Sequence, residues 1–221
     1  LLWTARTVLG GMQASFLQLS GIATSYTVGG IWLYILITHN QSGLARFYRR
    51  VYPLAALIIL AFEAWALVVQ LEKWGLKAAE YSFAIVWIAA LVSAGLLLFI
   101  KEKAYPAIVR MISILAIIPV FPVVGVHELP VNLQLNRLET ILVSEGMLQE
   151  DQVKPAPSPP EEPVREIITD AVSYIARAEN AKLPVWFDKN LNQPDRFKNK
   201  FGFEMTWPQP DPIKEIGRAH V

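Results

Sequence analysis

Four apolar stretches occupy the first part of the chain, and each is about long enough to cross a lipid bilayer. They run over residues 16–38, 52–71, 82–100 and 104–125. A helix needs roughly 20 mainly apolar residues to span a hydrocarbon core of about 30 Å. The stretch Phe83–Ile100 is apolar on all sides, whereas a helix on a soluble protein is usually apolar along one stripe. We therefore expect residues 1–126 to be a transmembrane region of four helices.

A polar tail follows over residues 127–214, and its pattern predicts two one-faced helices. The first places apolar residues at helical spacing and ends near Gly146, a typical C-cap residue; its stripe is Val131, Leu135, Leu138 and Leu142. The second carries Val164, Ile168, Val172 and Ile175 on one face. One-faced helices need a partner surface, so we expect each stripe to be buried.

Proline separates the two helices, and weak strand signals follow them. Residues 154–163 read KPAPSPPEEP, a composition typical of an extended, semi-rigid spacer. Residues 183–188 and 201–205 suggest short strands. The expected fold is thus all-α membrane: a four-helix transmembrane bundle, then a small, mainly helical extracytoplasmic tail.

The basic residues of the loops predict the orientation. The first loop carries Arg46, Arg49 and Arg50 without an acidic residue, and the third carries Lys101 and Lys103. The second loop mixes two lysines with two glutamates. Because short cytoplasmic loops are enriched in Lys and Arg, we expect loops one and three in the cytoplasm. The tail is then extracytoplasmic.

Charge distribution narrows the range of partners. Residues 1–126 hold 9 Lys and Arg against 4 Asp and Glu, and residues 127–221 hold 11 against 15. The near-neutral total therefore combines a basic membrane part with an acidic tail, which argues against nucleic-acid binding. The expected partners are the lipid bilayer, other membrane helices and envelope proteins. The absence of cysteine excludes disulfides and thiolate metal sites.

Glu63 and Arg110 form the candidate intramembrane polar site. Glu63 falls near the middle of the second stretch, where an ionisable group is costly and is a site hypothesis by default. It is either a proton or cation ligand or a carboxyl hydrogen-bonded to a neighbouring helix. Arg110 lies about six residues into the fourth stretch, and helix rise places the two at depths about 8 Å apart. A pair between them is therefore not favoured.

Small residues and prolines mark two further features of the stretches. Gly21, Ser25 and Gly29 lie four residues apart and form a ridge suited to close helix packing. Packing within the bundle is favoured over a dimerisation face. Pro119 and Pro122 should kink or end the fourth helix; we favour the end of the helix over a broken-helix binding site.

No motif for catalysis, cofactor or metal binding is found. The chain has no Gly-rich phosphate loop, no paired-histidine metal motif and no Ser-centred elbow. His39 and His127 lie singly at expected membrane edges, and the glycosylation sequon at Asn40 falls in the loop expected to be cytoplasmic. We therefore expect no enzyme activity, no catalytic residues and no cofactor. Residues 215–221 match the translation of a sequencing adapter, and we expect them to be read-through.

One segment after the last apolar stretch resembles a known family. Residues 132–148 read NLQLNRLETILVSEGML, with Gln134, Arg137, Leu138 and Glu139 in a Gln-x-x-Arg-Leu-Glu pattern before Gly146. With RFYRRVYPLA at 46–55 and EYSFAIVW at 80–87, this resembles the bacterial membrane proteins catalogued as domain of unknown function 4153. The likeness covers about residues 45–180. It implies a multi-pass protein of the bacterial inner membrane with an extracytoplasmic C-terminal region, and it implies no reaction.

Two functions fit these features. The favoured one is a non-enzymatic membrane protein whose external domain binds or senses something in the envelope. The Gln134, Arg137, Leu138 and Glu139 motif is then a packing motif of the tail. The alternative is a transporter or channel component that uses the Glu63 carboxylate.

Overall fold

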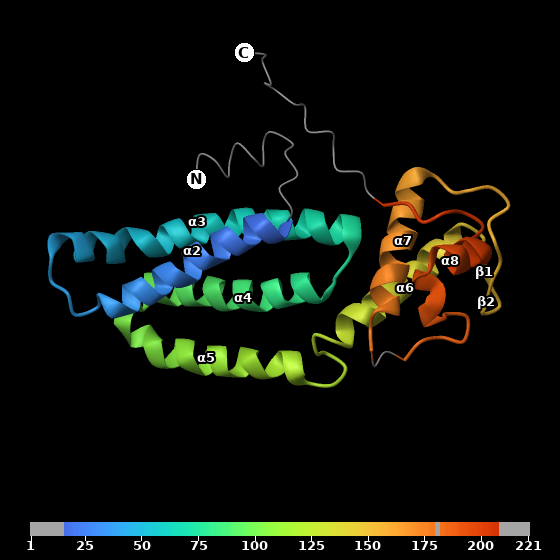
Figure 1. Ribbon diagram of the computed structural model, residues 1–221. Helices are drawn as coiled ribbons and strands as arrows, with labels where there is room; N and C mark the ends of the chain where they lie inside the picture. Colours follow the sequence, from blue (N-terminus) through green and yellow to red (C-terminus); the bar gives the residue numbers. More distant parts are fainter. Residues whose placement is uncertain (1–15, 180–181, 208–221) are drawn as a thin grey trace, which may run out of the picture. The chain divides into compact units, whose positions relative to one another are not determined.

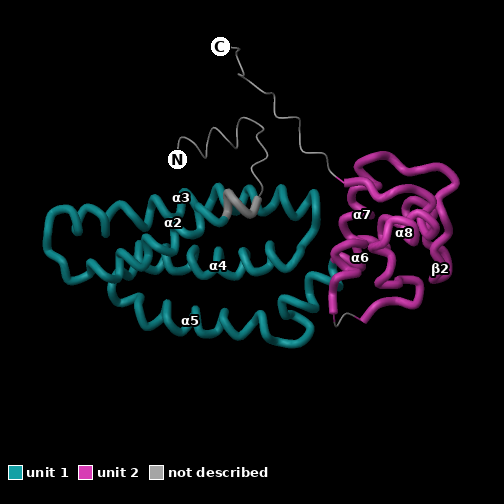
Figure 2. Tube along the Cα trace, in the orientation of Figure 1, with its two compact units in different colours: residues 1–133 teal, residues 134–221 magenta. Residues whose placement is uncertain are grey.

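A computed structural model describes residues 16–179 and 182–207, with the backbone alone for residues 16–20. The chain is mostly helical and divides into two compact units, residues 1–133 and 134–221 (Figures 1 and 2). Residues 215–221, expected to be read-through, lie outside the described residues.

Unit 1 consists of helices that match the four apolar stretches. Its elements are α2 (Phe16–Leu36), α3 (Gly43–Trp74), α4 (Ala78–Phe99), η1 (Lys101–Ala104), α5 (Tyr105–Ile117) and η2 (Ile118–Val120). Three segments are long and apolar enough to cross a membrane: Gly43–Trp74, Ala78–Phe99 and Lys101–Val120. Gly21–Leu36 is apolar but shorter. The membrane character of the region is confirmed to this extent, and a bundle of four crossings stays a prediction.

The core of unit 1 lies where three helices meet. Helices α2, α3 and α4 contact one another, and α5 lies against α4 (Figure 1). Ala56, Leu60 and Ala94 are fully buried at this junction. Large apolar side chains also cover the outside of the unit, including Trp65 at 64% and Phe99 at 83% exposure. Such a surface suits a hydrocarbon surrounding better than water.

Helix α3 is longer than the sequence pattern indicated. It begins at Gly43, where the Ser42 side chain accepts a hydrogen bond from the Ala45 N–H at 3.2 Å. This is an N-cap, which satisfies one of the free donors of the first turn. The helix continues through Pro53. The expected start at residue 52 is therefore too late, and the arginines of the first loop belong to the first two turns of α3.

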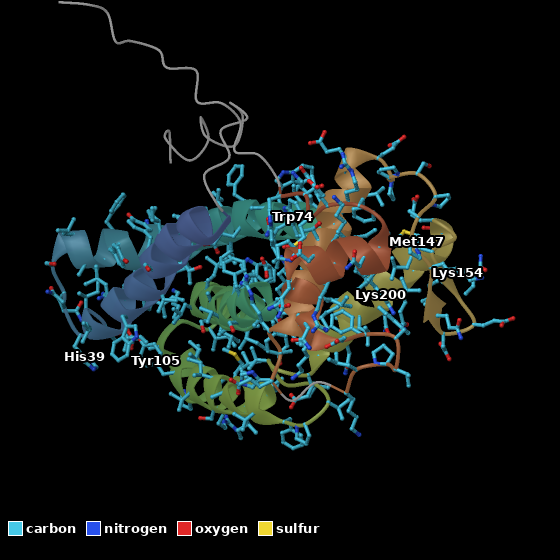
Figure 3. The ribbon with its side chains drawn as sticks, turned by 45° about the vertical axis from the view of Figure 1, so that its right-hand side comes forward. His39, Trp74, Tyr105, Met147, Lys154 and Lys200 are labelled. Atoms are coloured by element: carbon cyan, nitrogen blue, oxygen red, sulfur yellow. The ribbon has the colours of Figure 1, made fainter. Side chains whose placement is uncertain are left out.

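The connections lie at two opposite ends of unit 1. The α2–α3 loop and η1 lie at one end, and the short α3–α4 turn lies at the other (Figure 1). In Figure 3, His39 and Tyr105 lie at the first end and Trp74 at the second. Thr38 Oγ1 and the Tyr105 hydroxyl hydrogen-bond there and join the end of α2 to the start of α5. Loops one and three thus share one end, as the orientation argument requires.

The last apolar helix ends at its prolines. Helix α5 stops at Ile117, η2 contains Pro119, and Phe121 is extended. The Val126 N–H donates to the Pro119 carbonyl at 3.1 Å and closes the following turn. The interpretation of the prolines as the end of the helix is confirmed.

Unit 2 is a small helical unit with one short hairpin. The segment from residue 129 contains α6 (Leu129–Ser144), β1 (Leu148–Gln149), β2 (Gln152–Val153), α7 (Glu162–Ala176), η3 (Lys189–Asn192) and α8 (Pro194–Phe201). The two expected helices are confirmed. The expected strands are wrong: residues 183–188 form a turn and irregular backbone, and residues 201–205 only end α8 and continue irregularly. The hairpin β1–β2 forms instead and pairs Leu148 with Val153.

Aromatic side chains fill the core of unit 2. Phe197 and Phe201 are fully buried, and their ring centroids lie 4.7 Å apart. Phe203 packs on both, with centroids 5.5 and 6.2 Å away. Phe197 and Phe201 are four residues apart, which puts both rings on one face of α8, and Phe203 follows in the turn after the helix. This packing explains why the weak alternation around residue 201 does not produce a strand.

The proline-rich segment is held against α8. The Ala156 N–H donates to the Phe201 carbonyl at 2.9 Å, and the Lys154 N–H donates to the Met147 carbonyl at 2.8 Å. Met147 and Lys154 lie together beyond the end of α6 (Figure 3). A Cβ on Gly202 would lie 2.9 Å from the Ala156 carbonyl oxygen. The first residues of the segment are therefore docked, and the role of residues 154–163 as an extended spacer stays a prediction.

Candidate functional site

Glu63 lies on the inward face of α3, opposite α2. It follows the fully buried Leu60 by three residues, and its own side chain is 6% exposed. Thr24 of α2 donates a hydrogen bond from Oγ1 to Glu63 Oε1 at 3.4 Å. Within the described residues, Oε2 is buried and has no hydrogen-bond partner. The carboxyl is thus bonded to a neighbouring helix and keeps one oxygen available.

Arg110 does not contact this carboxyl. It lies on α5, which packs on α4, and its side chain is exposed. Its Nε donates to the Pro106 carbonyl, one turn earlier, at 3.2 Å. The structure therefore does not join the two members of the predicted polar site, in agreement with the estimate from helix depth.

A second buried carboxyl lies between α3 and α4. Glu80 is 4% exposed, and its Oε1 accepts a hydrogen bond from Gln70 Nε2 at 3.0 Å. Its Oε2 is also buried and without a partner in the part of the chain that the structure describes. Sequence reasoning placed Glu80 in the second loop and missed it. The spacing of Gln70 seven residues after Glu63 indicates a polar position on the same face of α3, but it does not identify Glu80 as the partner of Gln70.

Glu63 and Gln70, the hydrogen-bond partner of Glu80, lie on one face of α3. Seven residues make about two helical turns and a rise of about 10.5 Å, so Glu63 and Gln70 point in the same direction from α3. Trp87 of α4 donates from Nε1 to the Leu60 carbonyl at 2.9 Å, about one turn before Glu63. Polar groups at two depths of an apolar helix interface can hold protons or small cations, or can fix the helix register.

The small residues of α2 do not make the helix contact that the sequence suggested. Gly21, Ser25 and Gly29 are exposed, and a Cβ on either glycine would meet no atom within 4 Å. The expectation that this ridge packs inside the bundle is wrong. Gly30 is the residue at the contact, because a Cβ there would lie 2.1 Å from a ring carbon of Tyr52.

The tail motif divides between core and surface. Gln134 is 1% exposed and Leu138 is fully buried, as is Leu142 one turn later. Arg137 and Glu139 are half-buried. Burial lowers the pKa of the Arg137 guanidinium, and the nearby Asp170 carboxylate of α7 opposes that shift. The motif therefore packs α6 by Gln134 and Leu138 and brings Arg137 near α7.

Two expected surface features are found where the sequence placed them. His39 and His127 are both exposed and lie outside the apolar helices. Among the described residues, no group of three or more His, Cys, Asp or Glu side chains is placed to hold a metal ion. The candidate sites that the described residues offer are the two buried carboxyls and the charged surfaces.

Comparisons with protein-family models, with curated proteins and with solved structures find no match to this chain. The resemblance to domain of unknown function 4153 stays a prediction.

Proposed function

We propose that this chain is a non-enzymatic, multi-pass protein of the bacterial inner membrane that presents unit 2 outside the cytoplasm to bind or sense an envelope component. The observation that carries the proposal is the direct succession of two different kinds of core. Apolar helices with exposed Trp and Phe side chains are followed by a compact unit with its own buried aromatic cluster. A mere anchor needs no second core.

The orientation rests on the end of unit 1 that holds η1. Arg46, Arg49 and Arg50 lie there on α3, together with Lys101 and Lys103. The opposite end has Lys73 and Lys77, which lie 5.0 and 5.9 Å from the Trp74 ring, and it also has Glu72 and Glu80. The positive-inside rule counts lysines and arginines, so the first end faces the cytoplasm and the tail leaves on the other side.

Reporter fusions test this topology. Alkaline phosphatase becomes active only outside the cytoplasm, so a fusion after Trp207 should be active. Green fluorescent protein fused at the same position should be dark, because it is exported in an unfolded state. Fusions after Ser42 should give the reverse pattern. If green fluorescent protein is fluorescent and alkaline phosphatase inactive after Trp207, the proposal is overturned, since unit 2 would then face the cytoplasm.

A binding role is tested from the surface of unit 2. Val185 is fully exposed in the segment before Trp186, so a photo-crosslinking residue there leaves the core intact. A discrete adduct is expected in cells that carry the folded chain. The same probe in a Leu138→Asp background, which removes a core residue, should lose that adduct. An adduct that persists unchanged, or no adduct at any exposed position of unit 2, would argue against a binding domain.

A transporter or channel component is the second candidate, and the two buried carboxyls favour it. Glu63 and Glu80 each keep one buried oxygen without a partner in the described residues. Reconstituted into liposomes, a transporter would give a pH-dependent flux that requires Glu63. A binding protein would give none.

A further inference from the structure

The end of unit 1 that holds the first and third loops contains a basic pocket. It has a volume of about 370 Å³. Its charged lining consists of Arg46, Arg49 and Arg50 from α3 and Lys101 and Glu102 from η1. Four cationic groups and one carboxylate give a formal net charge of +3. Neither the candidate polar site nor unit 2 makes use of this pocket.

The pocket is built by fixed backbone around it. Arg49 Nη1 donates to the Ile37 carbonyl and, at 2.9 Å, to the Asn40 carbonyl, so the loop after α2 is tied to α3. Lys101 has a φ of 56°, a left-handed conformation that is costly for a residue with a side chain. That conformation ends α4 and begins η1. The cationic side chains therefore project from positions that the fold holds in place.

The Glu102 carboxylate compensates only part of the positive charge in the pocket. Arg46 and Arg50 are exposed, and within the described residues neither side chain has a hydrogen bond or an ion pair. The first turn of α3 holds no acidic residue. A helix N-terminus carries a partial positive charge, so the arginines add to it. An anion in the pocket would relieve this repulsion.

Part of the pocket lining is apolar. Leu97 and Leu98 of α4 line it, and Leu97 is almost fully buried. Phe99 and Ile100 follow on the outside of the helix and are exposed. Basic groups thus lie directly beyond the end of an apolar helix surface, where headgroups meet hydrocarbon. A ligand with a phosphate next to acyl chains fits both parts.

We propose that this pocket binds the phosphate of an anionic phospholipid, with Arg46, Arg50 and Lys101 as its ligands and the acyl chains along α4. Guanidinium groups bind phosphate in a bidentate manner. Tyr34, which is 2% exposed, also lines the pocket. The bound lipid would hold η1 against the start of α3.

Binding to lipid in a neutral background tests the site. The full chain is placed in phosphatidylcholine nanodiscs, and a fluorescent short-chain phosphatidylglycerol is titrated while anisotropy is recorded. Lys101→Gln should weaken binding about fivefold, because one basic group near an anionic lipid contributes about that factor. Arg46→Gln with Arg50→Gln should weaken it by about tenfold or more, and Arg46→Lys with Arg50→Lys by less.

Lys103→Gln is the matched control. Lys103 lies two residues from Lys101 in the same short loop and does not line the pocket. The Lys103→Gln variant removes the same charge from the same end of unit 1. Its affinity for the lipid should stay within about twofold of that of the unchanged chain. Equal losses in Lys101→Gln and Lys103→Gln would overturn the proposal, because the attraction would then come from diffuse loop charge. No loss in either variant would overturn it as well.

Competition distinguishes a lipid from a soluble phosphate compound. Inorganic phosphate and glycerol phosphate should displace the probe only at concentrations far above that of unlabelled phosphatidylglycerol, because they lack acyl chains. Displacement by glycerol phosphate at the same concentration as the lipid would overturn the assignment to a membrane lipid.

Discussion

At the residue scale, Gly30 controls how closely α2 approaches α3. A methyl group at this position would lie 2.1 Å from Tyr52 Cε2. Tyr52 cannot easily move aside, because its hydroxyl donates to the Thr27 carbonyl and its ring stacks on Tyr48 at 4.9 Å. The Tyr48 hydroxyl donates to the Gly30 carbonyl at 3.1 Å. The contact therefore combines a small residue with two anchored rings.

The first prediction compares two neighbouring glycines. Gly30→Ala should lower the free energy of unfolding of unit 1 by about 1–3 kcal/mol, the usual cost of overpacking. Gly29→Ala should leave it unchanged or slightly raised, since a Cβ there meets open space and alanine favours helix. Thermal unfolding in detergent measures both. An equal effect of the two substitutions would contradict the close contact at Gly30.

The second prediction concerns Glu63. Glu63→Gln keeps a group that can accept from Thr24 Oγ1, so expression and thermal stability should be nearly unchanged. Glu63→Leu should lower stability modestly, since hydrogen bonds between membrane helices average about 0.6 kcal/mol. Thermal unfolding and proteoliposome flux assays are done on the same preparations. If the unchanged chain shows a pH-dependent flux and Glu63→Gln loses it at unchanged stability, the proposed binding role is overturned and the transporter is supported.

At the element scale, α6 shows how far a residue pattern reaches. Its spacing predicted the buried Leu138 and Leu142 and the end at Gly146, which has a φ of 68°. The Met147 N–H donates to the Leu142 carbonyl, five residues earlier, at 2.8 Å. A hydrogen bond over this span is typical of a helix that ends at a glycine. A one-sided stripe identifies both the element and its inward face.

The helices of unit 1 show where such patterns stop. Hydropathy predicted their existence and rough bounds, but a helix that is apolar on all sides does not reveal its inward face. The ridge at Gly21 and Gly29 was therefore assigned to the inside, and Gly30 was missed. Glu80 was missed for a related reason, because charge near a loop suggests solvent. Contacts with other helices decide both, and these are not local properties.

The third prediction uses two apolar positions of α6. Leu138 is fully buried and Val143 is 59% exposed. Leu138→Asp should lower the stability of unit 2 by at least about 3 kcal/mol, since it leaves a cavity and buries a polar group. Val143→Asp should change it by no more than about 0.5 kcal/mol. Limited proteolysis of membrane vesicles measures both, and equal resistance of the two variants would show that the stripe packs on nothing important.

The fourth prediction concerns the link between α6 and α7. The Asp170 carboxylate opposes the downward shift that burial gives the Arg137 pKa. Arg137→Met and Asp170→Asn should each destabilise unit 2, and the double variant should cost less than the sum. A coupling of about 0.5–3 kcal/mol is expected for charges in one network. Strict additivity in urea unfolding would show that the two side chains act separately.

At the scale of the whole molecule, each unit contains tryptophans whose surroundings can be compared. Trp32 and Trp65 of unit 1 are 63% and 64% exposed at the surface of apolar helices. Trp186 of unit 2 is 5% exposed inside a protein core. An exposed apolar surface of this extent is stable when lipid covers it. The same residue type should therefore report two different surroundings.

The fifth prediction tests that difference with single-tryptophan chains. Lipids brominated along their acyl chains quench fluorophores that they contact. In vesicles of such lipids, a chain with Trp65 alone should lose most of its fluorescence, and acrylamide in the water should quench it weakly. A chain with Trp186 alone should resist both quenchers until Leu138→Asp opens the core, after which acrylamide alone should reach it. Quenching of Trp65 by acrylamide but not by brominated lipid would place α3 outside the bilayer, and the membrane assignment of unit 1 would fail with it.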